Sequence, residues 1–311
     1  MTDLQKTPFV RELASSDKKI RDKATESLTL FLRSRTDLSL MELLKLWKGL
    51  FFCFYHSDRP LTQQALARNL SYTLVPTLPR SAVHRFLRAF WITIGRDFHS
   101  LDRLRLDKYL FLIRCYVGVA FEVFVKGAQA QTKDDNKKRK REEAAQNGKS
   151  KKRSKGKKQS EAREEEEEEQ DDETKWAGLE SYISILEEGP LCPLNFDPDQ
   201  PATDEKSDYV AMPHGPDGLR YHIMDIWIDE LEKVLEFEEG ADGERKPKAG
   251  VPIDLILRPI EKLRAESPYK PVRTRAQEAL DDERLIEWGF RTQKVAADSD
   301  DESDEEWGGF D

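Results

Sequence analysis

The segment from Ser39 to His56, SLMELLKLWKGLFFCFYH, constrains the fold more than any other part of this sequence. Its apolar side chains recur at steps of three and four residues, which is the period of one helix face. Only Glu42, Lys45 and Lys48 form a polar stripe, so we expect other helices to cover most of this helix. These charges would be costly in lipid, which favours a buried core helix over a membrane span. Ser39 and Glu42 have the spacing of a capping box at the helix start.

Helical periodicity continues on both sides of this segment. Before residue 131 it predicts helices at about 7–13, 17–35, 39–56, 60–75, 79–98 and 102–126. Beyond residue 173 it predicts helices at 174–189, 217–235, 252–264 (kinked at Pro259) and 269–288, with a flexible connection at 240–250. No stretch alternates with a period of two. Because the connections are short, we predict an all-α fold that resembles a HEAT-like α-solenoid of antiparallel helices.

Charge and hydrophobicity divide the chain into four segments. Residues 1–131, the N-terminal helical block, hold 21 basic and 12 acidic residues, a net charge of +9, although the whole chain carries −9. Residues 132–173 contain almost no apolar side chains and predict a disordered linker, basic and then acidic. Residues 174–290 predict a second helical block that continues the array, and residues 291–311 predict a disordered acidic tail.

Two basic clusters in the predicted linker resemble a bipartite nuclear-localisation signal, which implies an importin as a partner. The alternative is a solvated linker whose basic and acidic runs attract each other. The candidate residues are Lys137, Lys138, Arg139, Lys140, Arg141, Lys151, Lys152, Arg153, Lys157 and Lys158.

The acidic tail ends in two isolated aromatic residues, Trp307 and Phe310. Such a pair in a disordered acidic segment is typical of a docking motif that orders when it binds. Ser299 and Ser303 each have an acidic residue at the third following position, which predicts phosphorylation by an acid-directed kinase. The alternative is a tail that only keeps the protein soluble.

The sequence has no recognisable catalytic constellation. Phosphate-binding glycine motifs and GxSxG are absent, and the five histidines show no spacing typical of metal ligands. The three cysteines are far apart, and Cys53 and Cys115 lie in apolar runs, which predicts buried free thiols. We find no signal-peptide pattern and no transmembrane segment. We therefore expect no enzyme, metal, cofactor, small-molecule substrate or membrane association.

Cationic side chains of the N-terminal block are the candidates for binding RNA phosphate or an acidic partner. They are Arg103, Arg105 and Lys108 near the start of the helix at 102–126, with Arg85 and Arg88 on the preceding helix.

Local pairing is the alternative for the first three residues of this set. Asp102 has the spacing to pair with Arg105, and Arg103 has the spacing to pair with Asp107, which leaves Lys108 without an obvious local partner.

Three long stretches carry a resemblance to a known family. They are LLKLWKGLFFCFYHSDRP (43–60), FLRAFWITIGRDFHSLDRLRLDKYLFLIR (86–114) and GLRYHIMDIWIDELEKV (218–234). These stretches resemble the nucleolar ribosomal RNA-processing protein 1 family, over roughly residues 7–126 and 174–290. The charged insertion at 132–173 interrupts the resemblance, and the long basic C-terminal extension of larger members is missing.

The resemblance implies a non-enzymatic, all-helical assembly factor of the nucleolus. Such a factor is a scaffold in early precursors of the large ribosomal subunit, close to pre-rRNA, and is required for large-subunit pre-rRNA processing. The resemblance also implies neighbouring assembly factors, including a Brix-domain protein and a β-propeller protein. A different hypothesis is a nuclear adaptor, similar to a histone chaperone, that uses its acidic runs to bind basic clients.

Overall fold

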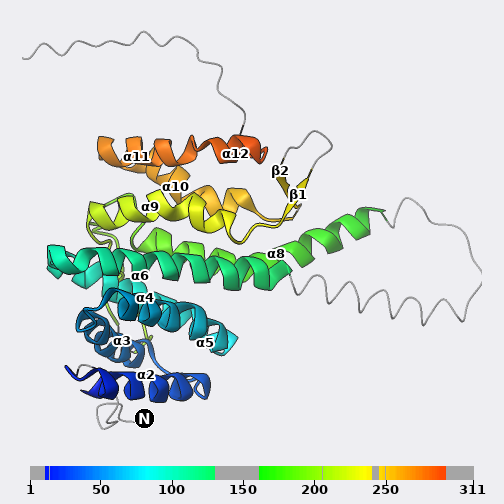
Figure 1. Cartoon of the computed structure of the whole chain (residues 1–311). Helices are drawn as coiled ribbons and strands as arrows, with labels where there is room; N and C mark the ends of the chain where they lie inside the picture. The colour runs from blue at the N-terminus through cyan, green and yellow to red at the C-terminus, as the bar shows by residue number, and fades with distance from the viewer. Residues whose placement is uncertain are drawn as a thin grey trace, which may run out of the picture.

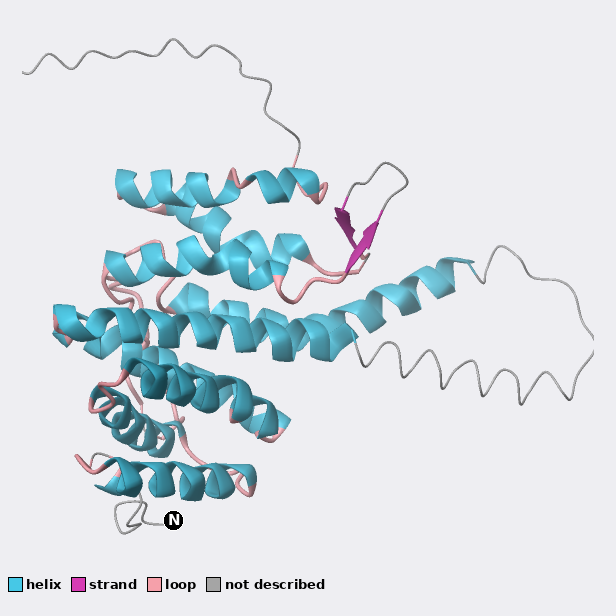
Figure 2. Ribbon diagram, viewed as in Figure 1, coloured by secondary structure: helices cyan, strands magenta, loops and turns pink. Residues whose placement is uncertain are grey.

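The computed structural model describes residues 11–13, 15–129, 161–204, 206–239, 245–248 and 250–291, with the backbone alone for 161–174, 239 and 245. Its helices stack in layers, with α2 at one end and α11 and α12 at the other (Figure 1). Figure 2 shows that helix dominates and that the only strands among the described residues form a small hairpin. This architecture confirms the predicted all-α, solenoid-like fold.

The first block contains α2 (Lys18–Arg33), α3 (Leu40–Tyr55), α4 (Pro60–Arg68), α5 (Arg80–Asp97) and α6 (Arg103–Phe121). Short π or 3₁₀ segments extend three of these helices, at Asn69–Thr73 and Val75–Thr77 after α4, Phe98–Ser100 after α5 and Glu122–Lys126 after α6. The second block contains α8 (Glu161–Glu188), α9 (Asp217–Glu232), β1 (Phe237–Glu239), β2 (Arg245–Pro247), α10 (Ile253–Glu266), α11 (Lys270–Leu280) and α12 (Glu283–Glu287).

Helix α3 is a core helix, as its sequence predicts. The Ser39 hydroxyl accepts a hydrogen bond from the Glu42 amide at 3.2 Å, and the Glu42 carboxylate accepts one from the Ser39 amide at 2.9 Å. This reciprocal pair is the predicted capping box. The buried Trp47 indole donates to the Phe86 carbonyl of α5 at 3.2 Å, and its ring lies 5.3 Å from that of Tyr116 on α6. Other helices therefore cover α3 on several sides.

The apolar core continues from one block into the other. Helix α6 packs against α4 on one side and α9 on the other, and α8 packs against α5 and α10. Phe121 of α6 meets Trp227 of α9 edge to face, with ring centroids 4.9 Å apart. The second block thus extends the stack of the first, and buried residues of both belong to one cluster.

The C-terminal elements differ from their predictions in two places. The predicted helix at 269–288 is two helices, because Asp282 leaves the helical conformation and its carboxylate caps the Arg284 amide at 3.0 Å. The predicted flexible connection at 240–250 overlaps an antiparallel hairpin, in which Phe237 pairs with Pro247. Its strands have three residues each, too short to show a period of two.

Helix α8 begins at Glu161, earlier than Thr174, where the sequence predicted structure to resume. Its first turns project away from the stack (Figure 1). Pro259 lies inside α10, as expected. Cys53 and Cys115 are buried free thiols, as predicted, and Cys192 is buried as well. Across the described part of the chain, no helix has both the length and the apolar character needed to cross a membrane.

Candidate partner-binding surface

Arg88 of α5 makes its polar contacts within the protein, with Glu188 and Val210. Its guanidinium donates two hydrogen bonds of 2.6 Å to the carboxylate of Glu188, at the end of α8. It also donates to the Val210 carbonyl at 3.2 Å and lies 5.3 Å from the Tyr209 ring. Burial alone would lower the pKa of Arg88, but the Glu188 carboxylate outweighs it and raises that pKa. Arg88 therefore fastens α5 to the segment between α8 and α9.

Arg85 lies one turn earlier on α5 and is half-exposed. It donates to the Leu38 carbonyl at 2.9 Å, and its Nε lies 3.6 Å from the Asp208 carboxylate. The other oxygen of Asp208 accepts a hydrogen bond of 2.7 Å from the Leu40 amide, in the first turn of α3. Asp208 adopts a positive φ of 54°, which is uncommon for a residue other than glycine. Arg85 and Asp208 together hold the start of α3.

Lys108 of α6 is buried, with 4% of its side chain exposed. Its ammonium donates to the Tyr55 carbonyl at 2.8 Å and to the Ser57 carbonyl at 2.9 Å, where α3 ends. A cation is favourable at this position because the last carbonyls of a helix carry partial negative charge. The partners of Lys108 lie 51 and 53 positions earlier in the chain, so the local spacing that identified the Asp102–Arg105 pair could not reveal them.

Arg105 and Arg103 have different surroundings. Arg105 pairs with Asp102 at 2.5 Å, which confirms the predicted local pair, and lies 4.1 Å over the Tyr55 ring. Arg103 is exposed, and the described part of the chain shows no ion pair between Arg103 and Asp107. Arg103 and the half-exposed Arg85 are thus the predicted binding residues with the most freedom to meet a partner. Their binding of RNA or protein stays a prediction.

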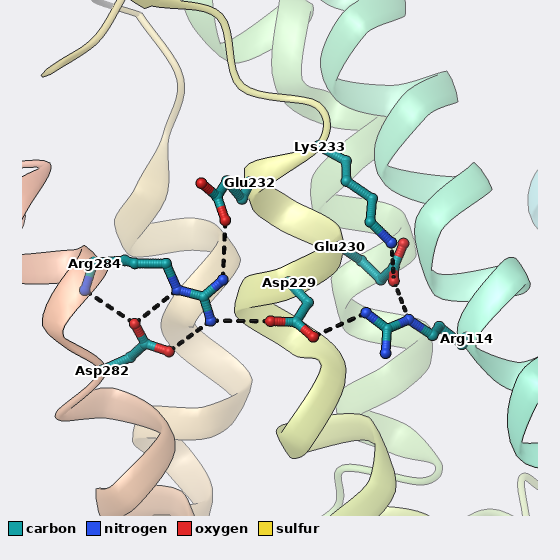
Figure 3. A network of polar contacts seen from close by, with 7 residues as sticks. All are labelled: Arg114, Asp229, Glu230, Glu232, Lys233, Asp282 and Arg284. Atoms are coloured by element: carbon teal, nitrogen blue, oxygen red, sulfur yellow. Dashed lines mark hydrogen bonds and ion pairs between the residues drawn. The ribbon is translucent and has the colours of Figure 1, made fainter. Parts of the chain in front are cut away.

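A network of seven charged residues ties the two blocks together (Figure 3). Arg114 of α6 donates to Glu230 at 2.5 Å and to Asp229 at 2.8 Å, both on α9. Arg284 of α12 donates to the other oxygen of Asp229 at 3.0 Å. Lys233, Glu232 and Asp282 complete the network.

Asp229 is the bridge between the two arginines of this network. Burial alone would raise the pKa of Asp229, but hydrogen bonds from Arg284 and Arg114 outweigh it and lower that pKa. The carboxylate therefore stays charged between its partners. The network fixes α6, α9 and α12 relative to one another, and so fixes the surfaces that they present.

A groove between α2 and α4 is a candidate docking surface that sequence reasoning missed. It has a volume of about 730 Å³ and is lined by Lys18, Asp22, Thr25, Glu26, Thr29, Leu30, Leu61, Thr62, Ala65, Leu66, Asn69 and Thr73. We call it the α2–α4 groove. Leu30 and Leu61 are 68% and 82% exposed. The signal that could have found the groove is the position of Leu30 and Leu61, outside the apolar stripes of their helices.

Three histidines have structural hydrogen bonds to backbone carbonyls. His84 contacts the Gly178 carbonyl at 2.7 Å, His222 that of Leu110 at 2.9 Å and His214 that of Leu194 at 2.6 Å. His84 also stacks on Phe124. Within the described ranges, no group of three or more histidine, cysteine or acidic side chains is arranged to hold a metal ion.

The other predicted functional residues lie outside the described part of the chain. They are the two basic clusters, Lys137–Arg141 and Lys151–Lys158, the aromatic residues Trp307 and Phe310, and the candidate phosphorylation sites Ser299 and Ser303. Their roles stay predictions.

Several known proteins resemble this chain in sequence. It is 28% identical over 243 residues to the human protein "Ribosomal RNA processing protein 1 homolog B", a match over 76% of this chain and 24% of the relative. It is 38% identical over 130 residues to the mouse protein of the same name, and 37% identical over 120 residues to the human "Ribosomal RNA processing protein 1 homolog A". These two matches cover 40% and 37% of this chain, and 18% and 26% of the relatives. The chain thus spans about a quarter or less of the length of these relatives.

A family model described as "Nucleolar protein, Nop52" matches residues 4–134 and 179–308. The matched segments include α2 to α6 and α9 to α12, and leave out the charged insertion between the two blocks. Because this match covers most of the sequence and both helical blocks, the chain belongs to the Nop52 family of nucleolar proteins.

Proposed function

We propose that this protein is a non-enzymatic scaffold of the nucleolus, which acts in early precursors of the large ribosomal subunit and is required for processing large-subunit pre-rRNA. The observation that carries the proposal is that both family-matched segments fold into one continuous helical array. Relatives of this chain are named for ribosomal RNA processing.

The array suits a scaffold because its layers are fixed by internal contacts. Arg88 with Glu188 fastens the first block to the chain that follows α8, and Arg114 with Asp229 fastens α6 to α9. These arginines also hold carboxylates in the charged form, as the lowered pKa values of Glu188 and Asp229 indicate. Such carboxylates are poorly suited to proton transfer near neutral pH.

The proposed partners follow from charge and from the family resemblance. Arg103 and Arg85 would meet pre-rRNA phosphate or an acidic partner, and the two basic clusters would bind an importin for nuclear entry. Neighbouring assembly factors would include a Brix-domain protein and a β-propeller protein.

Depletion of the protein tests the proposal. We expect large-subunit precursor rRNA to accumulate and mature large-subunit rRNA to fall, while small-subunit rRNA is spared. Re-expression of the wild-type chain should restore both. A selective defect of the small subunit, measured by pulse labelling and northern analysis, would contradict the proposal.

A charge-reversal variant tests the cationic contact separately. Arg103→Glu should weaken association with precursor particles and make its salt dependence shallower, because fewer counterions are released. Lys48→Glu, on the exposed stripe of α3, is the matched control for net charge. Equal loss in both variants would assign the effect to overall charge.

A further inference from the structure

The α2–α4 groove has the dimensions of a binding site for one helix. Arg21 of α2 contacts the carbonyl of His56, and Thr25 contacts Cys53, so α2 runs antiparallel to α3. Helix α4 returns directly after α3 and therefore runs parallel to α2. Leu61 then lies at the Lys18 end of the groove, and Leu30 at the opposite end. The lining of α2 spans residues 18–30, a length of about 18 Å or three helical turns.

The exposed side chains of Leu30 and Leu61 indicate that the groove binds a partner. Their side chains are mostly exposed although they line a concave, largely apolar site. Ala65 and Leu66 lie between them on the α4 wall. Exposed apolar side chains that line a concavity are typical of protein interaction sites.

The charges of the groove favour a basic occupant. The charged residues of its lining are Lys18, Asp22 and Glu26. Lys18 pairs with Asp22 at 2.8 Å, which leaves the exposed Glu26 as the uncompensated charge of the groove. A carboxylate at this position would repel RNA phosphate and attract a lysine or arginine.

The walls also restrict the conformation of the occupant. Both are helical, so their backbone N–H and C=O groups are engaged within the helices and do not offer a strand edge. An occupant must then satisfy its own backbone hydrogen bonds, and a helix does so within one segment.

We propose that the α2–α4 groove binds one amphipathic helix of a partner assembly factor. Apolar side chains of that helix pack on Leu61 and Leu30, and a lysine or arginine faces Glu26. This inference rests on the proposed function, which supplies the setting in which such a partner is met.

Site-specific photo-crosslinking in cells tests the occupant. A photoreactive phenylalanine replaces Leu61 in the full chain, and in a control chain it replaces Leu104, which is 92% exposed and is not part of the groove lining. Irradiated adducts are purified under denaturing conditions through a tag and mapped by mass spectrometry. We expect the Leu61 probe to mark one segment of a partner protein with helical apolar periodicity and a basic residue, and the Leu104 probe not to mark it.

Several results would overturn this inference. One is an adduct of the Leu61 probe with RNA, or with residues 1–10 or any other part of this chain. Another is an adduct with a partner segment that lacks helical apolar periodicity and a basic residue. The last is the absence of any adduct. Sedimentation of the same chains with precursor particles tests the proposed function. Crosslinking tests the groove, because an adduct can be recovered from chains that do not sediment with particles. Failure of one proposal can therefore be told from failure of the other.

Substitutions confirm the geometry once the crosslinked segment is known. Leu30→Gln with Leu61→Gln should weaken its binding at least about tenfold, because two apolar contacts are lost and no charge is added. Glu26→Lys should weaken it as well, whereas Leu104→Gln should not. All four side chains are exposed, so circular dichroism and melting temperature should match the wild type. Equal binding by the double variant and the wild type would also overturn the inference.

Discussion

The ammonium of Lys108 lies at the end of α3, where it donates to two carbonyls. Lys108→Met keeps the apolar stem but leaves both carbonyls without this donor. Because unsatisfied buried polar groups are costly, we expect the free energy of unfolding to fall by about 2–3 kcal/mol. Urea denaturation followed by circular dichroism measures this change.

Arg103→Met is the matched control, since Arg103 is an exposed cation on the same helix. It should leave the denaturation midpoint almost unchanged. Equal midpoints for the two variants would show that the Lys108 contacts do not stabilise the fold. Charge reversal at Lys108 would test folding rather than RNA binding.

Gly118 permits the close approach of α6, the π-helical turn after α4, and α9. A Cβ atom there would overlap the Tyr72 hydroxyl and would lie 2.7 Å from Glu230 Oε2. We expect Gly118→Ala to lower the free energy of unfolding by about 2 kcal/mol, although alanine favours helix. Thermal unfolding of the purified protein checks this prediction.

Gly127 provides the comparison, because a Cβ atom there meets nothing within 4 Å. Gly127→Ala should leave stability unchanged or raise it by up to about 1 kcal/mol. Adding Tyr72→Phe to Gly118→Ala should restore part of the loss, since it removes the hydroxyl in the way. No recovery would mean that the strain lies at Glu230 instead.

The three thiols should differ in reactivity. Burial raises the pKa of Cys53, and raises that of Cys115 to about 11. Burial would also raise the pKa of Cys192, but the neighbouring His214 ring and the charge of Arg220 outweigh it and lower that pKa. Cys192 also lines a cavity of about 530 Å³.

Since the thiolate is the nucleophile, Cys192 should react with an aromatic disulfide reagent at pH 7 at least about tenfold faster than the other two thiols of the native protein. Loss of the fast phase in Cys192→Ser, and its retention in Cys115→Ser, would support this assignment. A fast phase that persists in Cys192→Ser would contradict it.

Helix α3 shows what local sequence can predict about an element. The apolar period and the Ser39–Glu42 spacing lie within the segment itself, and both the core helix and its capping box are present. Helix α12 shows the limit of this reasoning, because its start depends on Asp282 leaving the helical conformation inside an otherwise periodic stretch. The period of three and four residues continues across that break.

The partners of the candidate binding residues were harder to predict from sequence than the helices that carry them. The Asp102–Arg105 pair lies within one turn, and spacing alone identified it. Arg88 and Glu188 are 100 positions apart, and Lys108 lies more than 50 positions from its acceptors. Such partners are set by the packing of layers, which periodicity does not specify. The α2–α4 groove was missed for the same reason, because it belongs to two helices together.

Acid should weaken the whole array through the carboxylates that join its layers. Glu188, Asp229 and Asp282 have pKa values below their ordinary ones, because the hydrogen bonds and charges of their arginine partners outweigh the effect of burial. These carboxylates therefore make their full contribution to the free energy of unfolding above their unfolded-state pKa values of about 4. That contribution is lost as the pH falls through their lower pKa values in the folded state.

We expect the free energy of unfolding to be nearly constant between about pH 5 and 7 and to fall below about pH 4. Urea denaturation at a series of pH values measures it. Arg284→Gln should lower stability at pH 7 by about 1 kcal/mol and should reduce the drop in acid, because Asp229 and Asp282 lose their common partner. An unchanged acid profile in this variant would show that the network in Figure 3 does not control acid stability.

The hydrogen bond from the Leu40 amide to Asp208 has a consequence for the order of events during translation. It joins residues 168 positions apart. At ordinary elongation rates, roughly ten to thirty seconds separate the synthesis of Leu40 from that of Asp208. Throughout that interval the nascent core helix has its own capping box but not its distant cap. During synthesis, the Ser39–Glu42 pair is therefore the cap that is available to the first turn of α3. Asp208 can accept the hydrogen bond of the Leu40 amide only after the connection between the two blocks has emerged from the ribosome.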